Sequence, residues 1–288
     1  MKQKDWIECA KRIEKDSHNY PQLKNFFRLM ISLQFLFPNL NQSLFLDKKR
    51  FVKQFYLQSI WEVRFLIQHF EFQPNDALKS YLTKEDWWWL FLNNMKEEKN
   101  HEAYFLSNFH ESLKKHKEKK SAGFYITPKD QIKVMCRYAL FFYLKNRDEI
   151  EINDRSLYQL IFQCKYPVDF QFKDNQRIVD ILLNLKILDP SCGTGLFLVE
   201  MNELLLSLIL ANPIFVKISS EEKTTITKNT FSQFYGFDID SNSVKLTKII
   251  LLHFYLQKTY NEGYLEKELT EFLNRLNVSE NDFFEEEI

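Results

Sequence analysis

A short segment near the middle of the chain combines residue types that could hold a nucleotide-like cofactor. Residues 187–195 read ILDPSCGTG, an apolar run that ends in Asp189 and continues into a turn with Gly193 and Gly195. The whole chain has five glycines, so two of them this close together indicate a turn that needs unusual backbone angles. A strand, a tight glycine turn and a helix form half of a nucleotide-binding site. Glycine turns also join strands to helices in proteins that bind no ligand, and that interpretation stays open.

A second acidic segment supports the ligand-binding interpretation. Residues 234–240 read FYGFDID and place Asp238 at the end of another apolar run, where a carboxylate can accept hydrogen bonds from ribose hydroxyls. Asp189 and Asp238 lie 49 residues apart, more than the roughly 20 residues of a dinucleotide-binding fold. The intervening helix must therefore be long or carry an insertion such as the polar stretch 219–229. This spacing argues against a plain NAD site.

A third segment upstream has the residues of a helix start. Gly123 is followed by Thr127 and Pro128, and apolar residues then recur at helical spacing from Ile132 to Leu140. Threonine is a common N-cap and proline a common first helical residue, so we predict that Thr127 caps a helix that begins at Pro128. Taken alone, this is an ordinary helix start after a loop. Together with the acidic segments, it offers a hydroxyl and free backbone N–H groups that favour a cofactor carboxylate.

These three segments together resemble motifs X, I and II of the N6-adenine DNA methyltransferases of type I and type IIG restriction-modification systems. The resemblance implies S-adenosyl-L-methionine as the cofactor, with Thr127 and Asp189 facing its methionine moiety and Asp238 binding its ribose. It also implies a close approach of the backbone to the cofactor at the two glycines of the turn. The implied cofactor-binding residues of these motifs are Thr127, Pro128, Asp189, Pro190, Cys192, Gly193, Gly195, Asp238 and Ile239.

A looser match to motif III of the family lies in residues 278–284. In that motif an Asp accepts a hydrogen bond from the adenine amino group of the cofactor, and the next aromatic residue packs on the adenine ring. The resemblance therefore implies Asp282 and Phe283 as further cofactor-binding residues. The alternative is a solvated acidic tail, since residues 280–287 hold five acidic side chains. Ile126 is a smaller departure, because the family usually has an aromatic residue just before the Thr-Pro pair.

The chain lacks the motif with which this family does its chemistry. Family members hold the flipped adenine with an Asn-Pro-Pro-Tyr type motif after motif III, whereas the seven prolines of this chain are all isolated. The nearest look-alike, Asn212-Pro213, lies between motifs I and II, where we expect it to close the helix that begins near Leu196. We therefore assign no catalytic residue and expect this chain alone to be inactive. A domain that stops here would expose a sheet edge and an apolar face, so we expect low solubility or a second polypeptide that completes it.

The first 120 residues differ from the rest of the chain. They contain no glycine, and their apolar residues recur at helical spacing, as in the run from Phe26 to Leu33. We interpret Thr83 and Asp86 as a helix start that leads into the three adjacent tryptophans of residues 87–89. Successive side chains of a helix point about 100° apart, so these rings cannot form one flat platform. Burial between helices is the favoured interpretation, and stacking on nucleic-acid bases is the alternative.

Composition and charge limit the class of protein. The 288 residues hold 39 basic and 39 acidic side chains, so the formal net charge is zero and the whole chain has no strong attraction to a polyanion. The basic run 114–120 is interpreted as a solvated linker, with phosphate contact as the alternative. Four cysteines without paired spacing or a nearby histidine indicate a reducing cytoplasm and no zinc site. No apolar run is long enough for a signal core or a membrane span.

We therefore expect an α/β protein. A Rossmann-like methyltransferase domain over residues 121–288, incomplete at its C-terminal end, would follow an all-α domain over residues 1–120. The leading function is the cofactor-binding part of an adenine-N6 DNA methyltransferase from a restriction-modification or related defence system, which contacts DNA largely through parts outside this chain. One alternative is a non-catalytic binding or assembly subunit, or the remnant of a split gene. Another is an RNA guanine-N2 methyltransferase, whose first turn is similar; the Gly-x-x-x-Thr-Pro segment favours DNA adenine.

Overall fold

The structure, a computed structural model, divides into two compact units. Unit 1 comprises Met1–Ile126 with Leu265–Thr270, and unit 2 comprises Thr127–Tyr264 with Glu271–Ile288. The residues that the structure describes are 3–37, 47–58, 60–89, 92, 103–113, 126–147, 152–166, 172–215, 217–259 and 266–283.

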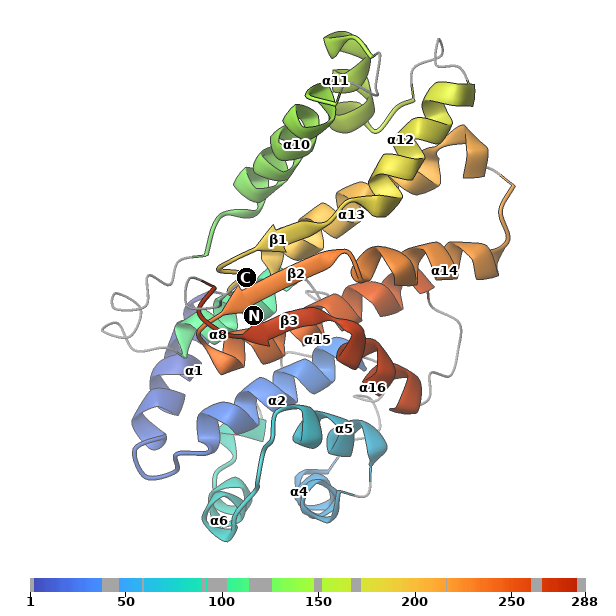
Figure 1. Cartoon of the computed structure of the whole chain (residues 1–288). Coiled ribbons are helices and arrows are strands. Elements are labelled where there is room, and N and C mark those ends of the chain that lie inside the picture. The colour runs from blue at the N-terminus through green and yellow to red at the C-terminus, as the bar shows by residue number, and fades with distance from the viewer. Residues whose placement is uncertain are drawn as a thin grey trace. The chain divides into compact units, whose positions relative to one another are not determined.

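Unit 1 consists of helices in its described part (Figure 1). Two helix starts follow from side-chain caps: Asp47 accepts a hydrogen bond from the Arg50 N–H at 3.0 Å, and Asn75 accepts one from the Leu78 N–H at 2.9 Å. Such caps satisfy backbone donors that the first helical turn leaves without partners. The helices are α1 (Gln3–Asp16), α2 (Leu23–Leu36), α4 (Lys48–Leu57), α5 (Trp61–His69), α6 (Asp76–Lys84) and α8 (Ala103–Ser112).

The three adjacent tryptophans belong to the packed interior of unit 1. Trp88 is fully buried, and its ring meets the ring of Phe26 edge-on with centroids 5.5 Å apart. Trp87 stacks on Phe27 at 5.4 Å. The Trp88 indole N–H donates to the Leu82 carbonyl at 3.0 Å, which satisfies the donor that burial would otherwise leave without a partner. Burial between helices is therefore confirmed for Trp88.

Of the predicted helix start at Thr83 and Asp86, the Asp86 part is confirmed, because residues 87–89 are helical directly after it, and the Thr83 part is wrong. Thr83 lies inside α6, near its end, and its hydroxyl donates to the Lys79 carbonyl at 2.8 Å. A threonine hydroxyl inside a helix commonly bonds back to the carbonyl four residues earlier, so this residue type marks a cap only where the backbone is extended. The backbone becomes extended two residues later, at Glu85.

Unit 2 holds a small parallel sheet together with helices. The sheet order is β1-β2-β3. The strands are β1 (Ile187–Asp189), β2 (Phe234–Asp238) and β3 (Asn277–Glu280). The helices are α10 (Lys129–Lys145), α11 (Asp154–Gln163), α12 (Phe172–Asn184), α13 (Leu196–Ala211), the short 3₁₀ helix η1 (Pro213–Phe215), α14 (Ser220–Phe231) and α15 (Ser241–Thr259). A further helix, α16 (Glu266–Arg275), belongs to unit 1 up to Thr270 and to unit 2 from Glu271. The chain is therefore an α/β protein with a helical part.

The described part of the connection between β1 and β2 contains two α-helices and the short η1, which agrees with the wide spacing of the acidic segments. The first is α13, which ends at Ala211, just before Asn212, as expected. The second, α14, occupies the polar stretch and starts with a capping box formed by Ser219 and Glu222. This box satisfies donors at both the N-cap and the first turn, which explains why so polar a segment forms a regular helix.

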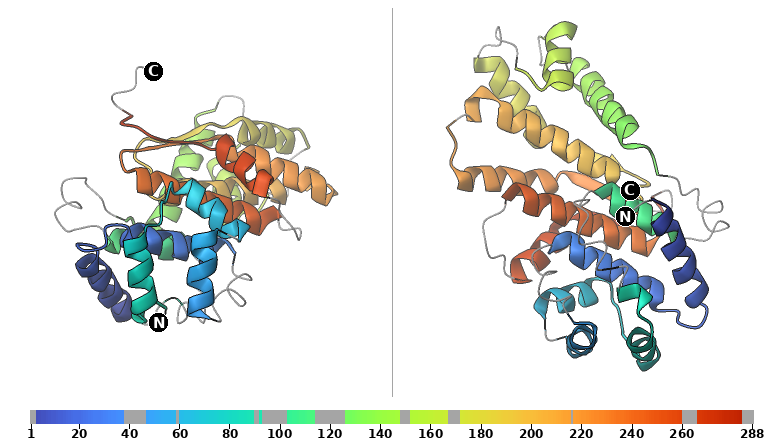
Figure 2. Two further views of the ribbon diagram at one scale, coloured as in Figure 1. Left: turned by 90° about the horizontal axis from the view of Figure 1, so that it is seen from below. Right: turned by 180° about the vertical axis from the view of Figure 1, so that it is seen from behind.

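Helices α13 and α15 pack on one face of the sheet. The buried residues on that face are Phe234, Gly236 and Val278. Both helices contact strands, and α10 packs beside α13. Figure 2 shows the same layer from behind, with these helices in front of the strands.

The opposite face of the sheet is less covered by the described residues. Strand side chains alternate between faces, so the register of β1 and β2 places Leu188 and Tyr235 together on this second face. Leu188 is 47 % exposed, and Tyr235 and Phe237 are partly exposed. An apolar strand residue this open is unusual for a parallel sheet, which normally has both faces covered.

Candidate functional site

The parallel register brings the predicted acidic residues to one edge of the sheet. Asp189 is the last residue of β1 and pairs with Gly236, while Asp238 is the last residue of β2 and pairs with Glu280 of β3. The carboxyl ends of parallel strands are where open α/β sheets bind ligands. We call the group Asp189, Gly193, Gly195 and Asp238 the strand-end site.

Asp238 is tied directly to the glycine turn. Its Oδ2 accepts a hydrogen bond from the Gly193 N–H at 2.8 Å, and its Oδ1 accepts one from the Asp240 N–H at 2.8 Å. The Cys192 N–H donates to the Phe237 carbonyl, also at 2.8 Å. A carboxylate has about four acceptor positions, so Asp238 keeps acceptor capacity for two further donors.

The two glycines of the turn are required for different reasons. Both have positive φ, 55° at Gly193 and 78° at Gly195. A Cβ on Gly195 would lie 2.5 Å from the Thr247 Cγ2, which is closer than real Cβ contacts. A Cβ on Gly193 would meet nothing within 4 Å. Gly195 is therefore a close contact between α13 and α15, whereas the space that a side chain at position 193 would enter is open.

Thr247 is a residue of this site that the sequence analysis missed. It lies on α15, is fully buried, and donates its hydroxyl to the Gly193 carbonyl at 2.8 Å. The carbonyl of Gly193 is thus held from one side by Thr247 while its N–H is held by Asp238. No local pattern indicates this role, because Thr247 is one of several polar residues in an otherwise apolar helix.

Burial and a neighbouring charge set the electrostatics of Asp189. Burial raises the pKa of its carboxyl above the ordinary value of 3.8, and a hydrogen bond from the Ser191 N–H, 3.2 Å long, opposes this. The carboxylate of Asp238 raises the pKa further. Two carboxylates that disfavour each other's charge attract a cationic group, so the edge is suited to an amine or another positive centre.

Cys192 and its neighbours contribute shape to the turn. Cys192 is buried, and burial raises the pKa of its thiol well above the ordinary range, so the sulfur is a neutral packing group. Its Sγ would lie 3.1 Å from a Cβ at Gly236, which explains why β2 has a glycine there. Pro190 and Ile239 are both exposed, Ile239 by 62 %.

The predicted cap at Thr127 is wrong by one residue. The helix α10 begins at Lys129 with Pro128 as its N-cap, and no side chain bonds to that cap. Pro128 has φ −57° and ψ 141°, and its carbonyl accepts from Gln131 at 3.0 Å and Ile132 at 3.1 Å. The proline therefore precedes the helix instead of opening it. Gly123 lies outside the described residues, while Thr127 is partly exposed just before the helix.

Helix α10 passes close to the strand-end site. The Cys136 thiol lies 3.9 Å from the Phe197 carbonyl of α13, and burial raises its pKa to about 12. The carboxylates of Glu200 and Asp189 contribute to that pKa shift. Phe197 is the second residue of α13, which begins directly after the glycine turn, so this part of α10 lies beside the start of α13.

The loose motif after β3 also reaches the same edge. The Asn281 N–H donates to the Asp238 carbonyl at 3.2 Å, and the Phe283 ring lies 5.6 Å from the ring of Phe237. Asp282 is exposed between them. Residues 284–288, which hold the rest of the acidic tail, lie outside the described residues.

Asn212 is a structural residue. It is fully buried; its Nδ2 donates to the Asn175 carbonyl at 3.1 Å, and its Oδ1 accepts from the Ile214 N–H at 2.9 Å. An asparagine that holds a base would need these groups for the base. The Asn212-Pro213 pair therefore closes α13, as expected from the sequence.

Neither the known protein families nor the curated proteins contain a match to this chain.

The described residues contain no group of three or more His, Cys, Asp or Glu side chains placed to hold a metal ion. None of the helices within them combines the length and the apolar character that crossing a bilayer requires.

The strand-end site offers two carboxylates and open space beside Gly193. The partly exposed rings of Phe237 and Phe283 lie next to it. A ligand with a cationic group, vicinal hydroxyls and a planar base has a partner for each of these features. A nucleoside with a charged substituent has this combination.

Proposed function

We propose that unit 2 binds S-adenosyl-L-methionine at the strand-end site, as the cofactor-binding part of an adenine-N6 DNA methyltransferase. The observation that carries the proposal is the double attachment of Asp238. One carboxylate fixes the glycine turn through the Gly193 N–H and still has acceptor positions for two ribose hydroxyls. A nucleoside held by those positions would lie beside Gly193, where a Cβ would meet nothing within 4 Å.

The remaining residues fit the other parts of the cofactor. Asp189 would accept from the amino group of the methionine moiety, and the positive sulfonium favours an acidic environment. Asp282 and Phe283 would meet the adenine, which gains from an acceptor for its amino group and from a ring face. Thr127 and Pro128 would close the methionine end from the start of α10. When bound, the cofactor supplies an electrophilic methyl group.

The Rossmann-like methyltransferase fold is part of the same proposal. Its support is the parallel order β1-β2-β3 with an acidic residue at the end of each of the first two strands. We place no catalytic residue in this chain, because it has no Asn-Pro-Pro-Tyr type motif. Methylation of DNA would further require that the adenine leaves the base stack.

Calorimetry of S-adenosylmethionine binding tests the proposal. Asp238→Ala should weaken binding by roughly 10- to 100-fold, because charged hydrogen bonds contribute about 1.5–3 kcal/mol. Asp180→Ala is the matched control, since Asp180 is an exposed acid on α12 of the same unit. Its affinity should equal that of the unchanged protein. Equal affinity of Asp238→Ala, with both variants folded by circular dichroism, would remove the assignment.

A second candidate function, a subunit completed by another polypeptide, is favoured by the second face of the sheet. Leu188 is 47 % exposed there, next to the partly exposed rings of Tyr235 and Phe237. An uncovered apolar sheet face promotes association. The purified chain should therefore self-associate in analytical ultracentrifugation, and Leu188→Lys should reduce this. A monomeric wild-type chain at all accessible concentrations would argue against this candidate.

A further inference from the structure

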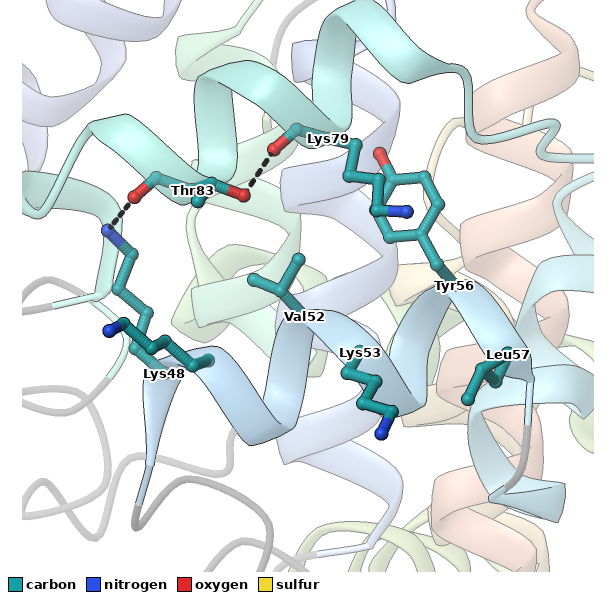
Figure 3. Close-up of a pocket in the computed structure, with 8 residues that line it drawn as sticks. Lys48, Val52, Lys53, Tyr56, Leu57, Lys79 and Thr83 are labelled. Carbon is teal, nitrogen blue, oxygen red and sulfur yellow. Dashed lines mark hydrogen bonds between the residues drawn. The ribbon is translucent and has the colours of Figure 1, made fainter.

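Unit 1 contains a pocket with several lysines, which the cofactor site does not use. The pocket lies between α4 and α6 and has a volume of about 380 Å³. Figure 3 shows the two helices and most of the lining side chains. We call it the lysine pocket; it is lined by Lys48, Lys49, Val52, Lys53, Tyr56, Leu57, Lys79 and Thr83.

Helical spacing explains how these residues converge. Residues four apart lie on the same face of a helix, so Lys48, Val52 and Tyr56 form one row on α4. Lys49, Lys53 and Leu57 form the adjacent row. Lys79 and Thr83 face them from α6 with the same spacing. The pocket thus has an apolar floor, with Val52 buried at its base, and a basic rim.

The lysines of the rim differ in how far their charge is neutralised. The Lys48 ammonium lies 2.6 Å from the Asp86 carboxylate and donates to the Thr83 carbonyl at 3.0 Å. The Lys79 ammonium lies over the Tyr56 ring, 5.4 Å from its centroid. Lys49 and Lys53 are exposed and have no carboxylate within ion-pair distance among the described residues. Two like charges four residues apart oppose helix formation, so this pair is not explained by the stability of α4.

The rest of unit 1 argues against a membrane surface as the ligand. Among the side chains of this unit whose burial the structure describes, Leu57, 65 % exposed, is the one large apolar side chain that is exposed. A helix that binds a bilayer buries a whole apolar face. A concave pocket with an apolar floor instead encloses one unit of a ligand, while its rim holds adjacent anionic groups.

We propose that the lysine pocket binds a nucleotide unit of a single-stranded nucleic acid. The phosphates on either side of the nucleotide lie against Lys49 and Lys53, and its sugar and base cover Val52 and the Tyr56 ring. Grooves that combine lysines for the backbone with aromatic and apolar surface for the bases are typical of single-strand binding. The zero net charge of the chain means that this affinity is local. The proposal depends on unit 1 alone and stands independently of the cofactor site.

Fluorescence anisotropy with a short labelled single-stranded oligodeoxynucleotide tests this proposal on the full chain. The double variant Lys49→Glu and Lys53→Glu should weaken binding by roughly tenfold or more, because two phosphate contacts are lost. The slope of log affinity against log salt should fall by about 1.4, since each contact on a single strand contributes about 0.7. Lys49→Gln with Lys53→Gln should give an intermediate loss.

The control uses the same charge change at the same spacing on another helix. Lys11 and Lys15 are exposed and four residues apart on α1, so Lys11→Glu with Lys15→Glu should leave the affinity unchanged. An equal loss in both double variants would overturn the proposal, because the effect would then come from overall charge. Absence of measurable oligonucleotide binding by the unchanged protein at low salt would overturn it as well.

Two additional sets of measurements distinguish a nucleic acid from a membrane as the source of phosphate, and the lysine-pocket proposal from the cofactor proposal. A single-stranded RNA of the same length should also bind, and a duplex should bind more weakly. Vesicles of phosphatidylserine and phosphatidylcholine should not bind; lysine-dependent vesicle binding without oligonucleotide binding would overturn the proposal in favour of a membrane. S-adenosylmethionine affinity should be the same in the Lys49 and Lys53 variant as in the unchanged protein, so a failure of one proposal is distinguishable from a failure of the other.

Discussion

The strand-end site and the lysine pocket are charged regions built in opposite ways. In the strand-end site, carboxylates are bound by backbone N–H groups of a tight turn, and Asp238 fixes the same turn that would contact a ligand. In the lysine pocket, long cationic side chains surround an apolar floor, and Lys49 and Lys53 are exposed. The first would be a rigid site for the proposed small ligand, whereas the second would adapt to the proposed single strand. The formal net charge of the chain is zero, so composition alone indicates neither region.

The rigidity of the strand-end site can be tested by substituting its two glycines. Gly195→Ala should lower the free energy of unfolding by about 2–5 kcal/mol, because it adds left-handed strain to overpacking against Thr247. Gly193→Ala should cost only about 1–2 kcal/mol, since it has strain and no clash. Chemical denaturation measures both. Equal losses would mean that the contact with Thr247 is not tight.

The independence of the two regions can be tested by measuring both cofactor affinity and oligonucleotide affinity in each variant. Asp238→Ala should lose cofactor binding and keep the oligonucleotide affinity of the unchanged protein. The Lys49 and Lys53 variant should show the reverse. Each affinity should fall by roughly tenfold or more, because Asp238→Ala removes charged hydrogen bonds and the lysine variant removes phosphate contacts. If either variant loses both activities, the comparison between two separate sites fails.

The smallest expected effect is a pH dependence at Asp189. Because the pKa of this carboxyl is raised in the folded protein, the folded state holds the proton more tightly than the unfolded chain. Its protonation therefore stabilises the fold at pH values below the ordinary 3.8, and this contribution is lost as pH rises through the folded pKa. Asp189→Asn should remove that part of the pH dependence of unfolding. Cofactor affinity should in contrast increase with pH over the same window, as the carboxylate forms.

The sequence predicts the parts of the strand-end site that depend on local chemistry. Asp189, the two glycines and Asp238 could be recognised because strand ends and tight turns restrict the residue types. Residue type alone predicts a cap at Thr127, but the extended ψ of Pro128 makes Pro128 the N-cap of α10. Residue type alone also predicts a cap at Thr83, whose backbone is helical. A cap depends on the backbone conformation, which a single residue does not determine.

The contacts between distant segments could not be predicted. Thr247 reaches the Gly193 carbonyl only because α15 packs beside α13. The spacing of Lys49 and Lys53 is visible in the sequence, but the pocket exists only because α6 places Lys79 and Thr83 opposite them. Tertiary packing supplies this information, and periodicity within one helix does not contain it.

The close fit of Gly195 against Thr247 has a consequence for the variation of this protein between organisms. Any side chain at position 195 would occupy the space of the threonine methyl group. A side chain at position 195 is therefore tolerated only together with a smaller residue at position 247, so a change at position 195 should be accompanied by a change at position 247. Positions 193 and 247 are joined through a backbone carbonyl instead, and there a serine could replace the threonine without any change in the turn.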